Sequence, residues 1–259
     1  MKLGRHVFGA AAIAFGITGL YWRSFNTWQQ INALGSVPHR EAFACIVAIL
    51  EIVGGVSIQW EKTAGAGAIM LGFIYLAFAL LWVPFIVATP LVYDRWGNFF
   101  EQFSLVSGAL IVFALSEKNN PKLTAKMVRA GYICFGICVI SFTLEQLFYL
   151  RGTASLVPKW IPPGQMFWAI ATTIAFALAA IALLSGRWAI TASRLLTAMI
   201  VLFGLLIWIP APFAYPHEMI SWAANAENFA IAGSAWIVMD YLNLKVSHTP
   251  AESQEAPQP

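Results

Sequence analysis

Four glutamates fall within long apolar stretches of the chain, where a carboxylate can take up or release a proton. These residues are Glu51, Glu101, Glu145 and Glu227. Glu51 is the most unusual, because it falls at the middle of the apolar stretch 42–60. An ionised carboxylate at the centre of a bilayer costs at least about 2.5 kcal/mol and is normally paired, protonated or turned to a cavity. No Lys or Arg stands at mid-stretch to pair with it, so a functional and a structural role are both consistent with Glu51.

Two of these glutamates belong to a segment that occurs twice in the chain. Six residues of the first copy, Trp82, Pro84, Pro90, Trp96, Glu101 and Phe103, recur 126 positions later as Trp208, Pro210, Pro216, Trp222, Glu227 and Phe229. The spacing is constant and contains no gap. Such a register predicts the duplication of one structural unit.

Composition indicates what kind of protein carries these residues. The chain is 59% hydrophobic and 10% charged, whereas a water-soluble domain carries about 25% charged residues. The apolar residues come in runs of about 20, the length of helix that crosses the hydrocarbon core of a bilayer. We therefore expect an all-α, polytopic membrane protein whose surroundings are the lipid bilayer. No basic patch stands outside the loops, which argues against nucleic acid as a partner.

The apolar runs predict eight transmembrane helices in two units of four. The expected helices are 1–22, 42–60, 64–84, 98–115, 128–150, 164–184, 189–210 and 224–244. The first unit is then 1–116 and the second is 128–244, joined by the basic linker 117–127. The tail 245–259 is polar and rich in proline, so we expect it to be disordered.

The positions of Lys and Arg predict the orientation. With the N-terminus inside, the inner segments hold Lys2, Arg5, Lys62, Lys118, Lys122, Lys126, Arg129, Arg187, Arg194 and Lys245. The outer segments hold only Arg23, Arg40, Arg95, Arg151 and Lys159. This bias places both termini in the cytoplasm. Because each unit has an even number of helices, the repeats are parallel and related by an axis along the membrane normal.

This topology gathers the unusual residues in the outer half of the bundle, where we expect any site. Besides Glu101, Glu145 and Glu227, they are Trp82, Trp96, Trp208 and Trp222. Structural explanations stand beside the functional one. Carboxylates near helix N-termini can interact with the helix dipole, tryptophans at this depth form an aromatic belt, and the prolines can stop a helix at the interface.

The two halves differ at two of the carboxylates. Aligning Trp60 with Trp188 sets Glu51 opposite Ala179, and Glu145 falls opposite the region 18–19. Each of these two carboxylates therefore occurs in one half only. This difference favours a single, asymmetric site.

Several chemistries find no support in the sequence. The four histidines, His6, His39, His217 and His248, lie in loops, helix ends or the tail, so no pair is placed to hold a haem within the membrane. No cluster of metal ligands, Gly-rich phosphate loop or nucleophile elbow is present. Cys134 and Cys138 are four apart, which is not the C-x-x-C of a thiol–disulfide catalyst.

The stretch 156–210 resembles the DoxX-like family of small bacterial membrane proteins. The resemblance lies in Val157 to Pro162 before a helix, in Phe167-Trp168 at its start, in the Gly186-Arg187 turn and in the final Pro210. Family members are usually four-helix units, so the resemblance implies a tandem duplication in the bacterial inner membrane. Relatives include a membrane subunit of a thiosulfate:quinone oxidoreductase. The resemblance therefore implies a quinone-associated or redox role.

Three hypotheses remain open at this point, and the sequence does not decide whether the protein is an enzyme. The first is an accessory subunit of a membrane redox system, which binds a quinone and a redox partner protein. In it, Glu145, Glu101 and Glu227 move protons to or from the quinone. The second is a transporter of a small cationic or neutral solute that uses Glu51 at the bilayer centre. The third is a non-catalytic assembly or scaffold protein.

Overall fold

The computed structural model describes residues 3–35, 37–117 and 120–247, and within these ranges the protein is helical without any strand. The long helices are α1 (Leu3–Trp22), α2 (Arg40–Ser57), α3 (Ala64–Leu81), α5 (Tyr93–Ser116), α6 (Pro121–Phe148), α8 (Gln165–Ser185), α9 (Ala189–Phe203) and α11 (Met219–Ser247). The predicted all-α class is confirmed. Among the described residues, six spans are long and apolar enough to cross a membrane: α1, α3 with α4, α5, α6, α8, and α9 with α10.

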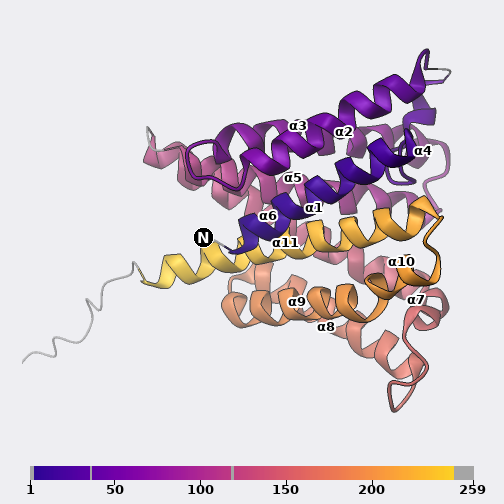
Figure 1. Cartoon of the computed structure of the whole chain (residues 1–259). Coiled ribbons are helices and arrows are strands. Elements are labelled where there is room, and N and C mark those ends of the chain that lie inside the picture. The colour runs from indigo at the N-terminus through magenta and orange to yellow at the C-terminus, as the bar shows by residue number, and fades with distance from the viewer. Residues whose placement is uncertain (1–2, 36, 118–119, 248–259) are drawn as a thin grey trace, which may run out of the picture.

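The shorter elements gather at one end of the bundle. They are η1 (Ile31–Leu34), α4 (Val83–Ala88), α7 (Leu150–Leu156), the π-helical turn η2 (Gly204–Trp208) and α10 (Pro210–Ala214). The opposite end holds the start of α1 and the end of α11 (Figure 1). Pro84 and Pro210 lie in the first turns of α4 and α10, where a missing N–H costs nothing. We expected these prolines to end a helix at the interface. In the structure each lies at the start of a short helix, α4 or α10, that directly follows a longer helical segment.

Three long helices begin about five or more residues earlier than the apolar runs suggested. The starts are Tyr93 for α5, Pro121 for α6 and Met219 for α11. At α6, the Asn120 side chain accepts a hydrogen bond of 3.1 Å from the backbone N–H of Leu123, which is an N-terminal cap. Most of the expected basic linker is therefore helix, while residues 118–119 and the tail from 248 lie outside the described residues.

These earlier starts change the interpretation of two glutamates. Glu101 and Glu227 each lie eight residues after the first residue of their helices, α5 and α11. The helix dipole acts within the first turn. The explanation of these two carboxylates by helix N-termini is therefore wrong, and their burial needs another account.

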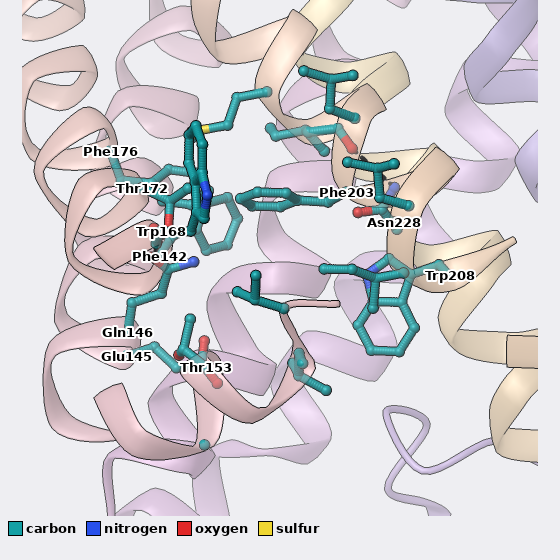
Figure 2. Close-up of a pocket in the computed structure, with 18 of the residues that line it drawn as sticks. Phe142, Glu145, Gln146, Thr153, Trp168, Thr172, Phe176, Phe203, Trp208 and Asn228 are labelled. Carbon is teal, nitrogen blue, oxygen red and sulfur yellow. Dashed lines mark hydrogen bonds between the residues drawn. The ribbon is translucent and has the colours of Figure 1, made fainter. Parts of the chain in front are cut away.

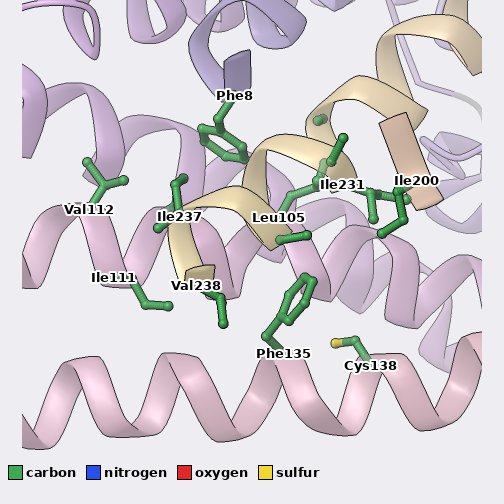
Figure 3. Close-up of a cluster of buried hydrophobic side chains, with 14 of the residues drawn as sticks. Phe8, Leu105, Ile111, Val112, Phe135, Cys138, Ile200, Ile231, Ile237 and Val238 are labelled. Atoms are coloured by element: carbon green, nitrogen blue, oxygen red, sulfur yellow. The ribbon is translucent and has the colours of Figure 1, made fainter. Parts of the chain in front are cut away.

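The helices pack as two rings that share α5 and α11. One ring consists of α1, α2, α3, α5 and α11, and the other of α5, α6, α8, α9 and α11. The largest hydrophobic core surrounds the shared helices, as Figure 3 shows for Phe8, Leu105, Phe135 and Ile237, which are all fully buried. Small residues permit this close packing.

Candidate functional site

A cavity of about 560 Å³ opens inside the second ring, towards the end of the bundle that carries the short helices. A volume of this size is typical of a small-molecule site. Its walls come from α6, α7, the connection after α7, α8, α9, η2 and α11, with Asp94 and Glu101 from α5. This is the half of the bundle where the sequence placed the site.

Aromatic side chains form much of the wall. They are Phe142, Tyr149, Trp168, Phe176, Phe203 and Trp208. In Figure 2, Glu145 and Gln146 lie on one side of the cavity, and Trp208 and Asn228 lie on the other. Gln146 Oε1 accepts hydrogen bonds from the hydroxyls of Thr172 at 3.2 Å and Thr173 at 3.1 Å. The cavity is thus largely apolar, with a few polar groups at fixed places.

Three carboxylates line the cavity: Asp94, Glu101 and Glu145. They lie close enough together for their charges to interact. Among the described residues that line the cavity, none is Lys, Arg or His. The described lining therefore offers no positive charge to an anionic ligand, so the cavity suits a neutral or a cationic molecule.

Glu145 owes its position to a glycine on the neighbouring helix. A Cβ added to Gly97 of α5 would collide with the Glu145 carboxylate. The absence of a side chain at Gly97 therefore creates the space that this carboxylate occupies, at the contact of α5 with α6. The sequence alone did not point to Gly97, because it shows only a glycine between Trp96 and Asn98.

Glu227 precedes the cavity residue Asn228 in α11, does not line the cavity itself, and is 3% exposed. Its Oε1 accepts a hydrogen bond of 3.3 Å from Gln102 Nε2, and its charge would interact with Glu101 and Glu145. The Oε2 atom of Glu227 and the Oε1 atom of Gln102 are buried without a partner among the described residues. Unsatisfied buried polar atoms are rare in native structures and often contact water.

The cavity wall contains an irregular stretch of helix at η2. The backbone widens there to π-helical bonding, and Ile209 N–H donates to Gly204 O at 2.7 Å. Two asparagines of α11 secure this stretch. Asn228 Nδ2 donates to Ile200 O at 3.2 Å, and Asn225 Nδ2 donates to Trp208 O at 2.9 Å. Such π-bulges are frequent at functional sites.

Glu51 lies in the other ring and does not line the cavity. It is 2% exposed, and Gln29 Nε2 donates a hydrogen bond of 3.2 Å to its Oε1. Gln29 belongs to the connection between α1 and α2, which packs into the first ring with Phe25 and Ile31 against Phe78 of α3. The partner of Glu51 is thus an amide side chain from a loop. The sequence analysis considered only Lys and Arg within the apolar stretches as partners.

The four predicted tryptophans have different surroundings. Trp208 lines the cavity. Trp82 is buried, and its Nε1 donates to the Trp28 carbonyl at 2.9 Å. Trp96 and Trp222 donate from Nε1 to the carbonyls of Pro90 and Pro216, at 3.0 and 3.1 Å.

Of the eight candidate residues, the structure therefore places Glu101, Glu145 and Trp208 on the cavity, and Glu227 close enough for its charge to interact with Glu101 and Glu145. Glu51, Trp82, Trp96 and Trp222 lie elsewhere. Sequence analysis missed Asp94, Gln146, Trp168 and Asn228. Only Trp168 carried a signal, as part of the Phe-Trp start of α8.

No group of three or more His, Cys, Asp or Glu side chains within the described residues is arranged to hold a metal ion. The cavity can hold a small apolar molecule against aromatic rings, accept hydrogen bonds from it, and exchange protons with it through carboxylates. Comparisons with family models, with curated proteins and with solved structures found no match to this chain.

Proposed function

We propose that all eight long helices span the bilayer, with both termini in the cytoplasm of a bacterial cell. Six spans meet the criteria of length and composition. For α2 and α11 the support is their packing, because each runs antiparallel to α1, which is itself such a span, and packs along it. The bias of Lys and Arg towards the end that holds the termini supports the orientation.

The bundle consists of two parallel repeats, one made of α1 to α5 and the other of α6 to α11. The contact pattern supports this: α5 packs on α6 as α11 packs on α1, and exchanging the halves preserves every neighbour pair in the two rings. Exchanging the halves also relates two hydrogen bonds, from Trp96 to the Pro90 carbonyl and from Trp222 to the Pro216 carbonyl. Gly108 and Ser234, which are also 126 apart, touch each other, as residues on a two-fold axis must.

The two rings are not equivalent inside, and this favours a single site. In the second ring the connection between α6 and α8 leaves the cavity of about 560 Å³. In the first ring the connection between α1 and α2 inserts Phe25 and Ile31, which are both buried. The filled ring serves as scaffold, and the open ring binds the ligand.

The ligand is the head group of a quinone, and the protein is an accessory subunit that presents this quinone to a redox partner. The observation that carries this proposal is the cavity lining, in which aromatic walls surround Glu101 and Glu145 and none of the described residues is basic. Reduction of a quinone to a quinol takes up two electrons and two protons. The electrons come from the partner, and the carboxylates pass the protons. The resemblance to DoxX-like proteins points to the same class and remains a prediction.

Mass spectrometry of an organic extract of the detergent-purified protein tests this proposal. Stoichiometric quinone is expected in the wild type, at a level above that of an unrelated membrane protein purified in the same way. Glu145→Leu should weaken retention about two- to tenfold, because it removes the carboxylic acid that donates a hydrogen bond to a quinone carbonyl, and such a bond contributes about 0.5–1.5 kcal/mol. Glu51→Leu is the matched control, since it also removes a buried glutamate but lies outside the cavity, and it should retain the quinone. Quinone no higher than in the unrelated protein would refute the proposal.

A second candidate is transport of a small organic cation, and one observation favours it. Three carboxylates and several aromatic faces without a basic residue are also what a cation site requires. Uptake of a labelled organic cation into vesicles, abolished by Glu145→Gln, would select this candidate. If Glu51 couples transport to protons, Glu51→Gln should abolish proton-driven uptake as well. The scaffold hypothesis gains only if wild-type protein neither retains quinone nor transports the cation.

A further inference from the structure

Three buried polar atoms between the cavity and Glu51 have no hydrogen-bond partner among the described residues. They are Gln102 Oε1, Glu227 Oε2 and the Tyr75 hydroxyl. All three side chains are at least 97% buried. A buried polar atom without a partner costs about 1–3 kcal/mol, and native proteins usually avoid this cost with an internal water molecule.

Contacts between helices set the order of these side chains. Gln102 of α5 and Glu227 of α11 are joined by a hydrogen bond of 3.3 Å. A Cβ at Gly54 of α2 would meet Leu71 of α3, so Glu51 and Tyr75, each about one turn beyond this contact on antiparallel helices, lie at the same level.

Glu227 interacts electrostatically with the cavity residues Glu101 and Glu145. Tyr75 of α3 interacts with both Glu227 and Glu51. A line of ionisable groups therefore crosses the shared helices and joins the open ring to the filled one.

Aromatic packing holds the Tyr75 side chain within the first ring. Its ring packs edge-on against Phe8 at 6.1 Å between ring centres, and it lies tilted against Phe15 at 6.4 Å. Glu51 and its partner Gln29, from the connection between α1 and α2, are both buried as well. Tyr75 is thus an ionisable group placed between Glu51 and Glu227.

We propose that water molecules buried at these three atoms complete a hydrogen-bonded chain, and that protons pass along it between the cavity carboxylates and Glu51. Each transfer breaks one O–H bond and forms another on the next oxygen of a water, Glu227 or Tyr75, while Gln102 Oε1 only accepts a hydrogen bond from a water, so no other reactant is needed. Exchange with deuterated solvent replaces each O–H by O–D in the same steps. The chain functions whether the cavity holds a quinone, a cation or water alone, so it does not rest on the function proposed above.

Infrared spectroscopy of the full-length protein in lipid bilayers tests the chain. The C=O stretch of the Glu51 carboxylic acid is the band that Glu51→Gln removes, and it shifts when the acid exchanges its proton for a deuteron. After transfer to D₂O, the shift should be slower in Tyr75→Phe and in Glu227→Gln. We expect a slowing of about tenfold or more, because the remaining route to Glu51 requires local opening of the helices.

The matched control is Tyr132→Phe, which removes a hydroxyl that donates to Leu183 O on the other side of the bundle. It should leave the exchange of the Glu51 band unchanged. Tyr75→Phe removes only an unpartnered oxygen, so folding should be preserved. An unchanged rate in Tyr75→Phe, an equal slowing in Tyr132→Phe, or the absence of any band that depends on Glu51 would each overturn the proposal.

Discussion

The crossing of α5 and α11 predicts the cost of a single added side chain. A Cβ on Gly108 would lie 2.5 Å from Ser234 Oγ, 3.0 Å from its Cβ and 3.2 Å from its Cα. The third atom is backbone, so rotation of the serine cannot relieve the contact, and the helices must separate. Overpacking of this kind costs about 1–3 kcal/mol. At about 2–4 °C per kcal/mol for a chain of this length, Gly108→Ser should lower the Tm by about 2–12 °C.

The same contact predicts that a second change repairs the first. Exchanging the two residues, as Gly108→Ser with Ser234→Gly, restores one glycine and one serine across the proposed two-fold axis. Ser234→Gly alone should cost about 0.5–1 kcal/mol, since it places a second glycine within a helix. The double variant should therefore be more stable than the sum of the single changes implies, by about 0.5–3 kcal/mol.

Thermal unfolding followed by circular dichroism at constant detergent measures all three variants. Gly72→Ser is the control, because a Cβ at this mid-helix glycine of α3 would meet only Ala109 Cβ, at an ordinary 3.4 Å. It should be neutral or slightly stabilising. A Gly108→Ser protein as stable as Gly72→Ser, or a double variant no better than additive, would refute the close and symmetrical contact of the two helices.

Three further substitutions test other parts of the structure. Gly97→Ala should displace the Glu145 carboxyl group and weaken ligand retention about two- to tenfold. Its cost in stability should not exceed about 1 kcal/mol, because the displaced atoms are the end of a flexible side chain. Mass spectrometry and thermal unfolding separate these effects, and unchanged retention would contradict the assigned space. Trp82→Phe should remove the hydrogen bond to the Trp28 carbonyl and lower the free energy of unfolding by about 0.5–1.5 kcal/mol. Amide hydrogen exchange should then become faster in residues 24–34 but not in α8. An equal change in both segments would count against the role of Trp82. Phe135→Ala should cost about 3–5 kcal/mol in thermal unfolding, because the ring is fully buried between α5, α6 and α11; a cost below about 1 kcal/mol would show that the core is packed differently.

Local patterns in the sequence were sufficient for the helical class and for the approximate positions of the helices. Runs of about 20 apolar residues predict spans wherever they occur, because the thickness of the bilayer sets the length. Helix starts were less predictable. The polar residues 121–127 predicted a linker, but they form the first turns of α6, which begins at Pro121 after the cap residue Asn120. A capped helix can extend beyond its apolar part into water, so the polar sequence did not mark its start.

The sequence also placed four glutamates at significant positions, but it could not say which of them meet. In a membrane protein, lipid-facing and core-facing side chains are both apolar, so hydropathy does not reveal which face of a helix points inward. Only packing showed that Glu101 and Glu145 share a cavity, that Gly97 makes room for one of them, and that Glu51 is partnered by Gln29 in the other ring.

What the sequence determined by itself was the constant spacing of 126 residues and the difference between the halves at Glu51 and Glu145. What the tertiary structure alone decided was which half is open. Both halves have similar helices, but the connection after α1 inserts Phe25 and Ile31 into its ring, whereas the connection after α6 leaves space within its own. The physical reason is that a cavity is the volume that packed side chains fail to fill, and contacts between segments far apart in the chain set that volume.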